Sequence, residues 1–266
     1  MKPFLKWAGN KYRQAEQIKC RFPQARRLIE PFVGSGALFL NTNYEHYLLN
    51  DRNTDLINLY HALKTEGRPF IDYCKCFFTP ENNKKDAFYL FRELFNTTQD
   101  TRLKSALFVY LNRHCFNGLC RYNSKNKFNT PFGKYQQPYF PEQEMLFFHQ
   151  QAQKALFKMA HFVEIMETAQ LGDVVYCDPP YVPLSKTAHF TCYSQEGFSQ
   201  DQHITLASLA QQLANKGIPV IISNHQTDFT LSIYKEASIE TFEIQRNISC
   251  HGEKRGKTTE LLAVFS

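Results

Sequence analysis

The chain has 266 residues, of which 43% are hydrophobic and 21% are charged, and its formal net charge is +6 at pH 7. This composition is typical of a globular protein with one large or two modest domains, and no internal repeat or low-complexity tract is visible. The apolar stretches are too short to cross a membrane and no signal peptide is visible, so we expect a cytoplasmic protein without a membrane partner. Eight cysteines without C-x-x-C spacing indicate free thiols and argue against a zinc ribbon or a disulfide scaffold.

The N-terminal segment, residues 4–11, contains the only tryptophan of the chain, Trp7, together with Lys6 and Lys11. Two lysines and an aromatic ring are suited to wrapping the anionic or carboxylated end of a ligand. By itself, the segment is equally compatible with an amphipathic lead-in that packs on the body of the protein.

A short buried strand is predicted at residues 28–33, followed by Gly34-Ser35-Gly36 and an apolar helix start at residues 37–40. A glycine turn from strand to helix lets a ligand approach the backbone closely and exposes helix N–H groups. The dinucleotide-binding fingerprint requires a further glycine where this chain has Phe39. The turn therefore favours a nucleotide-type ligand without a pyrophosphate.

A second strand is predicted at residues 47–51, and it ends in Asp51. An acid at this position is the arrangement that binds ribose hydroxyls in nucleotide-binding folds. The alternative, that Asp51 caps a helix containing residues 56–59, stays open. Taken with the glycine turn, Asp51 indicates a cofactor that contains a ribose.

More residues separate Asp51 from Asp178 than one strand–helix unit needs, so the sequence predicts an insertion into the sheet domain. Helical spacing of apolar residues occurs at 55–63, 86–95 and 103–112. The turn-rich residues 123–127 lie inside the segment 119–132, which predicts a hairpin. We therefore expect a mainly helical insert that carries a β-hairpin.

Residues 101–141 contain no Asp or Glu but seven cationic side chains, interleaved with aromatic rings. This combination is typical of a nucleic-acid-binding surface, although a solvated basic face over a structural aromatic core is the alternative for any one residue. A smaller cationic cluster is predicted to lie in a late loop and to hold the phosphate backbone. The seven cations are Arg102, Lys104, Arg113, Arg121, Lys125, Lys127 and Lys134, the aromatic residues are Tyr110, Phe116, Tyr122, Phe128, Phe132 and Tyr135, and the late cluster is Arg246, Lys254, Arg255 and Lys257.

The sheet is predicted to resume after the insertion, and its strands are expected at 155–161, 173–177, 219–223, 239–244 and 261–265. A helix is predicted at residues 199–216, where Gly217 would stop it. Strands that alternate with helices favour an α/β fold with a Rossmann-like sheet domain.

Asp178-Pro179-Pro180-Tyr181 follows the apolar run at residues 174–177. The residue before a proline is held extended, and two prolines fix φ and remove two backbone N–H donors, so this corner is stiff and rich in acceptors. A planar heterocycle with an exocyclic amine, such as adenine, would find acceptors in the Asp178 carboxylate and an adjacent carbonyl, and an aromatic face in Tyr181. The alternative is a plain turn after a strand.

These motifs, in this order, resemble those of the DNA adenine-N6 methyltransferases of the Dam family, and the likeness spans nearly the whole chain. It rests on residues 4–9, 30–36 and 178–181, with further matches at 112–113, 117–123, 131–133, 138–141 and 223–225. The resemblance implies an α/β, Rossmann-like S-adenosylmethionine-dependent methyltransferase domain at 1–53 and 142–266, and a mainly helical target-recognition domain with a β-hairpin at 54–141. It also implies methyl transfer to a flipped adenine in double-stranded DNA, within GATC, without a metal or an obligate protein partner.

The resemblance further implies roles for individual residues. The catalytic positions of the family are matched by Asp178, Pro179 and Tyr181. The positions that bind S-adenosylmethionine are matched by Trp7, Lys11, Gly34, Gly36, Asp51 and Asp178. The positions that contact DNA are matched by Lys6, Arg113, Phe116, Asn117, Leu119, Arg121, Pro131 and Lys134. The planar fork of Arg121 suits the edge of a guanine.

Three positions depart from the family pattern. Phe116 replaces a tyrosine that inserts into the duplex where the target base leaves, so the wedge is kept and the hydroxyl is lost. Asn10 replaces a glycine, which bears on the local backbone angle. Lys134 stands where arginine is common, so a phosphate contact there becomes a point-charge contact.

Other classes of enzyme fit the motifs less well. Cytosine-N4 methyltransferases usually have serine where Asp178 stands, a Rossmann oxidoreductase would need the missing glycine, and a zinc deaminase would need a Pro-Cys-x-x-Cys motif that this sequence lacks. Glutamine methylation of a protein would leave the acid-free basic segment unexplained. Two alternatives stay open, namely a methyltransferase of a restriction–modification system with a related target and a DNA-binding module without activity.

Overall fold

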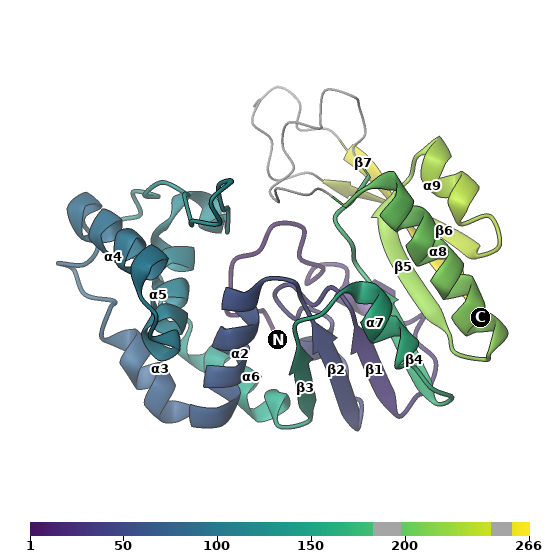
Figure 1. Ribbon diagram of the computed structural model, residues 1–266, viewed down its shortest axis with the longest axis horizontal. Coiled ribbons are helices and arrows are strands. Elements are labelled where there is room, and N and C mark those ends of the chain that lie inside the picture. Colours follow the sequence, from purple (N-terminus) through teal and green to yellow (C-terminus); the bar gives the residue numbers. More distant parts are fainter. Residues whose placement is uncertain (183–197, 246–256) are drawn as a thin grey trace.

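Seven strands form one sheet in the computed structural model, which describes residues 1–182, 198–245 and 257–266 of the chain (Figure 1). Their order is β3-β2-β1-β4-β5-β7-β6. The first five of these run parallel, whereas β7 runs antiparallel to both β5 and β6. The strands are β1 (Arg27–Glu30), β2 (His46–Asn50), β3 (Ala155–Lys158), β4 (Asp173–Cys177), β5 (Val220–His225), β6 (Ser238–Gln245) and β7 (Lys257–Phe265).

The helices of the described ranges connect and cover these strands. They are α1 (Ala15–Lys19), α2 (Thr54–Glu66), α3 (Arg68–Lys75), α4 (Lys85–Thr97), α5 (Thr101–His114), α6 (Glu142–Ala152), α7 (Phe162–Glu167), α8 (Gln200–Asn215) and α9 (Asp228–Ile233), with the 3₁₀-helices η1 (Phe39–Asn41) and η2 (Phe116–Gly118). None of them is both long and apolar enough to span a membrane. Figure 1 shows α3, α4 and α5 beyond the β3 edge of the sheet, whereas α2 packs against both β3 and α6.

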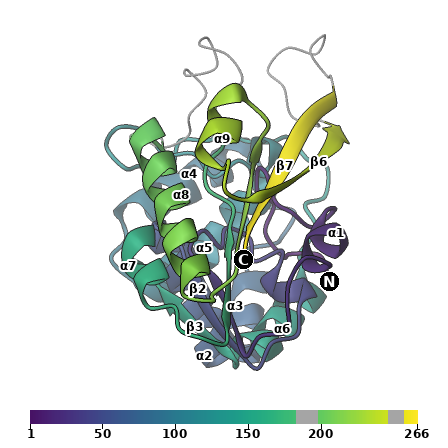
Figure 2. The same ribbon diagram turned by 90° about the vertical axis from the view of Figure 1, so that its right-hand side faces the viewer.

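Helices cover both faces of the sheet, because successive strand residues point to opposite sides. Leu28 and Val174 belong to one apolar core, and their chain neighbours Ile29 and Val175 belong to the other. α7 and α8 pack on one face, and α1 lies on the opposite face (Figure 2). With both faces buried, a ligand can reach this sheet at the ends of its strands.

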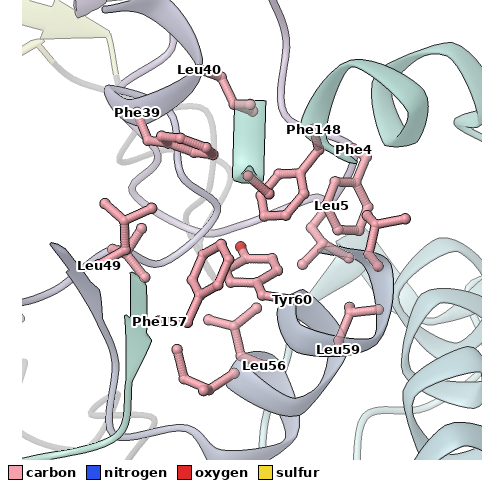
Figure 3. Close-up of a cluster of buried hydrophobic side chains, with 14 of the residues drawn as sticks. Phe4, Leu5, Phe39, Leu40, Leu49, Leu56, Leu59, Tyr60, Phe148 and Phe157 are labelled. Atoms are coloured by element: carbon pink, nitrogen blue, oxygen red, sulfur yellow. The ribbon is translucent and has the colours of Figure 1, made fainter. Parts of the chain in front are cut away.

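An aromatic core between β3, α2 and α6 fixes the N-terminal segment (Figure 3). Phe4, Tyr60 and Phe148 are fully buried. The ring centroids of Tyr60 and Phe148 lie 4.6 Å apart, and those of Phe4 and Phe148 lie 5.1 Å apart. Aromatic pairs at such distances contribute about 0.5–1.5 kcal/mol beyond the area they bury. This packing holds the residues after Phe4 beside the loop that follows β1.

The strand order reverses between β1 and β4. β1 continues to β2 and β3 in one direction, and β4 continues to β5 in the other, so the loops after β1 and β4 diverge at their carboxyl ends. In open parallel sheets, ligands bind in the crevice outside such a switch point. Here the two loops contain Gly34-Ser35-Gly36 and Asp178-Pro179-Pro180-Tyr181.

The prediction that a helix starts at residues 37–40 is wrong in its extent, since only the short η1 forms there. The Asn41 amide donates to the Ala37 carbonyl at 2.7 Å, and the Thr42 hydroxyl donates to the Leu38 carbonyl at 2.9 Å. Side chains that satisfy backbone carbonyls in this way compete with helix continuation. The glycine turn therefore leads into a tight loop and not onto the N-terminus of an α-helix.

The hairpin predicted within residues 119–132 is not built from regular strands. One isolated bridge, between Tyr122 and Phe128, lies within it, and a second joins Phe132 to Cys115, just before the predicted hairpin. The segment between α5 and α6 is thus a loop folded back on itself.

The strand predicted at 155–161 ends at Lys158, because His161 caps α7 and accepts a hydrogen bond from the Val163 amide.

Candidate active site

The Asp178 carboxylate lies at the carboxyl end of β4 and faces a lysine from the N-terminal segment. Lys11 Nζ is 3.2 Å from Asp178 Oδ1, and the Lys11 side chain is 5% exposed. Asp178 Oδ1 accepts no hydrogen bond of good geometry from the described residues. The carboxylate is therefore charge-paired but keeps acceptor capacity for a ligand.

A second carboxylate, that of the buried Glu260 on β7, completes this group. Its Oε2 atom lies 3.7 Å from Lys11 Nζ and accepts a hydrogen bond from the Tyr181 hydroxyl at 3.2 Å. Lys11 Nζ also lies over the Tyr181 ring, 4.4 Å from its centroid. We call Lys11, Asp178, Tyr181 and Glu260 the charged cluster. Sequence reasoning missed Glu260, which lies directly before the strand predicted at residues 261–265.

Burial shifts the titration of the acids near the switch point. Burial raises the pKa of Asp178, and the Lys11 ammonium opposes that rise. Burial also raises the pKa of Glu260, again against the effect of Lys11. The pKa of Glu30, at the end of β1, is raised to about 8, mainly by burial and to a lesser degree by the charge of Asp178, while a hydrogen bond to the Phe39 backbone opposes the rise. These acids are poorly solvated, so neighbouring charges and hydrogen bonds readily change their protonation.

The loop after β1 is held in its conformation by hydrogen bonds to its backbone. The Gly34 amide donates to Asp51 Oδ2 at 3.1 Å, and the Tyr60 hydroxyl donates to the Gly34 carbonyl at 2.6 Å. Gly34 and Gly36 have positive φ values of 47° and 72°. Asp51 is not the cap of α2, because Asn53 accepts the hydrogen bond from the Leu56 amide. Asp51 instead ties the ends of β1 and β2 together.

The Asp178-Pro179-Pro180-Tyr181 corner is anchored by β5. Asn224 is fully buried, and its Oδ1 accepts a hydrogen bond from the Val182 amide at 3.2 Å. His225 Nδ1 lies 2.9 Å from the Val182 carbonyl, and its ring meets the Tyr181 ring edge-on with centroids 4.7 Å apart. Asn224 and His225 therefore fix the corner on the sheet through Val182, the residue that follows it.

Most residues predicted to contact DNA lie on the loop between α5 and α6. The Phe116 amide donates to the Pro131 carbonyl at 2.8 Å, and the Asn129 amide donates to the Arg121 carbonyl at 3.0 Å, so the two arms of the loop lie together. The Phe116 side chain is half exposed. The exposed residues of this loop include Phe116, Asn117, Arg121, Pro131 and Lys134, and Leu119 is half-buried.

Lys6 joins the N-terminal segment to this loop. Its amide donates to Asn112 Oδ1 at 2.9 Å, and the Asn112 amide donates back to the Lys6 carbonyl at 2.7 Å. Its side chain crosses Gly118, where a β-carbon would lie 2.3 Å from Lys6 Cβ, and ends 4.0 Å from the centroid of the Tyr135 ring. Lys6 is thus placed beside the predicted DNA-contact residues, and burial lowers its pKa.

Arg113 differs from the other predicted DNA contacts. Its side chain is buried, and its guanidinium donates a hydrogen bond to the Phe4 carbonyl. Arg113 therefore links α5 to the N-terminal segment. The exposed Arg121 has its guanidinium turned toward Asn129, donating to Oδ1 at 2.7 Å.

The acid-free segment is only partly a basic surface, which corrects the sequence interpretation. Arg102 pairs with Glu66 at 2.7 Å and Lys104 pairs with Asp55 at 3.0 Å, both acids lying outside the segment. Tyr110 and Phe128 are buried in the core. The exposed cations that remain are Arg121, Lys125, Lys127 and Lys134. In the late cationic cluster, Arg246, Lys254 and Arg255 lie outside the described residues.

The six cysteines that lie in the described ranges are all free. Four of them are at least half-buried, and burial raises the pKa of each of these thiols. Thiolates are therefore disfavoured there, and these cysteines behave as small apolar side chains.

The model of one protein family, described as D12 class N6 adenine-specific DNA methyltransferase, matches residues 7–248. The chain belongs to this family. It is a DNA adenine-N6 methyltransferase, for which the family implies S-adenosylmethionine as cosubstrate and DNA as substrate. The alternative of a DNA-binding module without activity is thereby set aside.

Relatives of similar length are described as DNA adenine methylases. The chain is 50% identical to that of Vibrio cholerae serotype O1 over 264 residues, which cover 99% of this chain and 95% of the relative. It is 47% identical to that of Serratia marcescens over 263 residues, covering 98% and 97%. It is 45% identical to that of Escherichia coli K12 over 262 residues, covering 98% and 94%.

Proposed function

We propose that this methyltransferase modifies the adenine of GATC in double-stranded DNA, and that the charged cluster at the β1/β4 switch point is its catalytic centre. The observation that carries the proposal is the Asp178 carboxylate, which is paired with Lys11 while its Oδ1 accepts no well-oriented hydrogen bond from the described residues. A carboxylate in this state is ready to accept a hydrogen bond from an amine. The GATC target rests on the family resemblance and on the similarity to the DNA adenine methylases.

In the proposed mechanism, the Asp178 carboxylate and the Pro179 carbonyl each accept a hydrogen bond from one of the two N–H groups of the adenine amine. The lone pair of this amine is delocalised into the ring, so the free base is a poor nucleophile. These two hydrogen bonds draw the nitrogen toward tetrahedral geometry and direct its lone pair at the methyl donor. The ionised Asp178 also stabilises the positive charge that develops on the nitrogen, and the Tyr181 ring stacks on the base.

The residues around the switch point fit S-adenosylmethionine. Gly34 and Gly36 place no side chain at two positions of the loop after β1, and Asp51 directly follows β2, where a ribose would lie. Ser35 Oγ and Glu30 Oε1 are buried without a hydrogen-bond partner among the described residues, so polar groups are left for a ligand. When bound, this cosubstrate supplies an electrophilic methyl group on a sulfonium. We assign its binding to Trp7, Lys11, Gly34, Gly36, Asp51 and Asp178.

We assign DNA recognition to residues 54–141 and the catalytic domain to 1–53 and 142–266. The amine of a paired adenine is engaged in the duplex, so the base must leave the stack before transfer. Phe116 is exposed on the loop between α5 and α6, where it can take the space of the departed base. Contacts to bases and phosphates are assigned to Lys6, Asn117, Leu119, Arg121, Pro131 and Lys134. Arg113 supports the loop indirectly, because it links α5 to the N-terminal segment.

A labelling experiment tests the proposal. Purified protein is incubated with S-adenosylmethionine carrying a labelled methyl group and with duplexes that contain GATC or the same bases in another order, and the modified base is then mapped. We expect label at N6 of the GATC adenine and little in the permuted duplex. Equal labelling of both duplexes, or none in GATC, would overturn the specificity.

A further inference from the structure

Glu260 is a buried carboxylate that directly precedes the apolar half of β7, residues 261–265. It is 4% exposed, and the next residues, Leu261 and Leu262, are also buried. Burying a charged group is costly unless partners compensate for the lost water. In the register of β7 with β5, Glu260 lies opposite His225, at the carboxyl end of the parallel sheet. This position places Glu260 beside the proposed catalytic centre.

The partners of Glu260 are the groups that the proposed function uses. Tyr181 donates its hydroxyl hydrogen bond to Glu260 Oε2, and Lys11 Nζ lies 3.7 Å from the same atom. The same Lys11 nitrogen pairs with Asp178. One ammonium is thus shared between two carboxylates, and burial leaves little water to screen them.

We propose that Glu260 is a positioning residue for methyl transfer. It holds the Tyr181 ring by its hydroxyl and draws part of the Lys11 charge away from Asp178, so that Asp178 stays an available acceptor for the adenine amine. This inference rests on the proposed function, because it takes Asp178 and Tyr181 as the groups that hold the base. Without the Glu260 charge, Lys11 would pair with Asp178 alone and compete with the amine for its oxygens.

The shared ammonium also links the titration of the two acids. Both carboxylate oxygens contact one nitrogen, so they lie within about 7 Å of each other, and at this range the charge of one disfavours ionisation of the other. Asp178 must be ionised to accept the amine. The acid limb of the activity profile therefore reports whether Glu260 is charged.

Glu260→Gln tests the proposal, because glutamine keeps the shape and an acceptor for Tyr181 but removes the charge. We expect kcat to fall about tenfold or more, with the KM for GATC duplex changed by less than about threefold. We expect the acid limb of kcat to move about one unit toward lower pH, since a nearby negative charge is lost. The matched control is Glu240→Gln on the neighbouring β6, whose side chain is 39% exposed and pairs with Arg21. It should behave like the wild-type enzyme.

Three outcomes decide the matter. A Glu260→Gln enzyme with wild-type kcat overturns the proposal, and so does a slower enzyme whose acid limb has not moved, because a merely structural role would give that result. If Glu260→Gln does not fold, Glu260→Asp replaces it, and its retained charge should leave the acid limb in place while the shorter side chain lowers kcat. An acid limb that moves in Glu260→Asp contradicts the proposal.

The failure of the proposed function would look different. An Asp178→Asn enzyme as active as the wild type would remove Asp178 from the mechanism without any measurement on Glu260. With Asp178→Asn inactive, an unmoved acid limb in Glu260→Gln refutes the role of Glu260 alone.

Discussion

Trp7 and Gly34 are in such close contact that a β-carbon on residue 34 would lie 2.8 Å from the indole Nε1 atom of Trp7. Both residues are assigned to cofactor binding. Gly34→Ala would push the indole aside and strain a backbone with φ of 47°. We expect its affinity for S-adenosylmethionine to fall about tenfold or more, because the displaced indole loses its place at the ligand and a loss of about 1.4 kcal/mol of binding free energy is enough for a factor of ten. Calorimetry, or the fluorescence of the only tryptophan, measures it.

Gly172→Ala is the matched control for Gly34→Ala. Gly172 also has a positive φ, 92°, but a β-carbon there meets no atom within 4 Å. It shares the backbone strain of about 1–2 kcal/mol and lacks the contact with Trp7. If both variants bind S-adenosylmethionine equally, the Trp7 contact has no part in cofactor binding.

Asp178→Ala should abolish methyl transfer and leave DNA binding largely intact. We expect kcat to fall by at least about a thousandfold, because the acceptor that prepares the amine is lost. The affinity for a GATC duplex, measured by fluorescence anisotropy, should change by less than about threefold, since affinity for DNA comes mainly from cationic contacts. Glu167→Ala, which removes an exposed acid at the end of α7, serves as control. Activity near the wild-type level in Asp178→Ala would refute the catalytic assignment.

Glu30→Gln should change how stability depends on pH. Burial raises the pKa of Glu30 from 4.5 to about 8, so the folded protein keeps a proton that the unfolded chain releases. The stability that protonated Glu30 contributes is therefore complete below pH 4.5 and is lost as the pH rises through about 8. The variant lacks this loss, so its free energy of unfolding relative to the wild type should rise by about 1.4 kcal/mol per pH unit across that window. Urea unfolding of the cofactor-free proteins measures it, and parallel pH profiles would contradict the assignment.

Much of the sheet could be predicted from local patterns. The strands predicted at 28–33, 47–51 and 173–177 formed as β1, β2 and β4, which are buried on both faces, although β1 ends at Glu30, earlier than predicted. α8 begins at a capping box in which Ser199 and Gln202 exchange hydrogen bonds, and Gly217 follows it with φ of 76°. Such signals are complete within a few residues, so no tertiary information is needed.

The contents of the active site required distant partners. Glu260 looks like an ordinary member of a strand, and its role depends on Lys11 and Tyr181, which are far away in the chain. The strand was predicted only at 261–265, which left Glu260 outside it, so the rule that an acid in a buried strand needs a partner was not applied to this residue. The pairing of Arg102 with Glu66 escaped prediction as well, since a segment free of acids can still fold against acids from elsewhere.

Phe116→Ala should slow methylation of paired adenine more than that of unpaired adenine. The exposed ring of Phe116 is assigned the space left by the flipped base, and flipping costs least when the base is already mismatched. We expect about a tenfold loss of kcat/KM on a GATC duplex and a loss of less than about threefold when the target adenine faces a mismatch. Phe116→Tyr, which keeps the ring, should retain activity on both. Equal losses for Phe116→Ala on the two substrates would show that the ring has no part in flipping.

β7 follows every other strand in the chain but lies between β5 and β6. Until its residues come into place, the β5 edge exposes unpaired N–H and C=O groups, and such edges recruit strands from other molecules. Closing the sheet requires contacts of long sequence separation, and such contacts form slowly. Refolding at high protein concentration is expected to lose material to aggregation at this step, and the yield of active enzyme should rise on dilution.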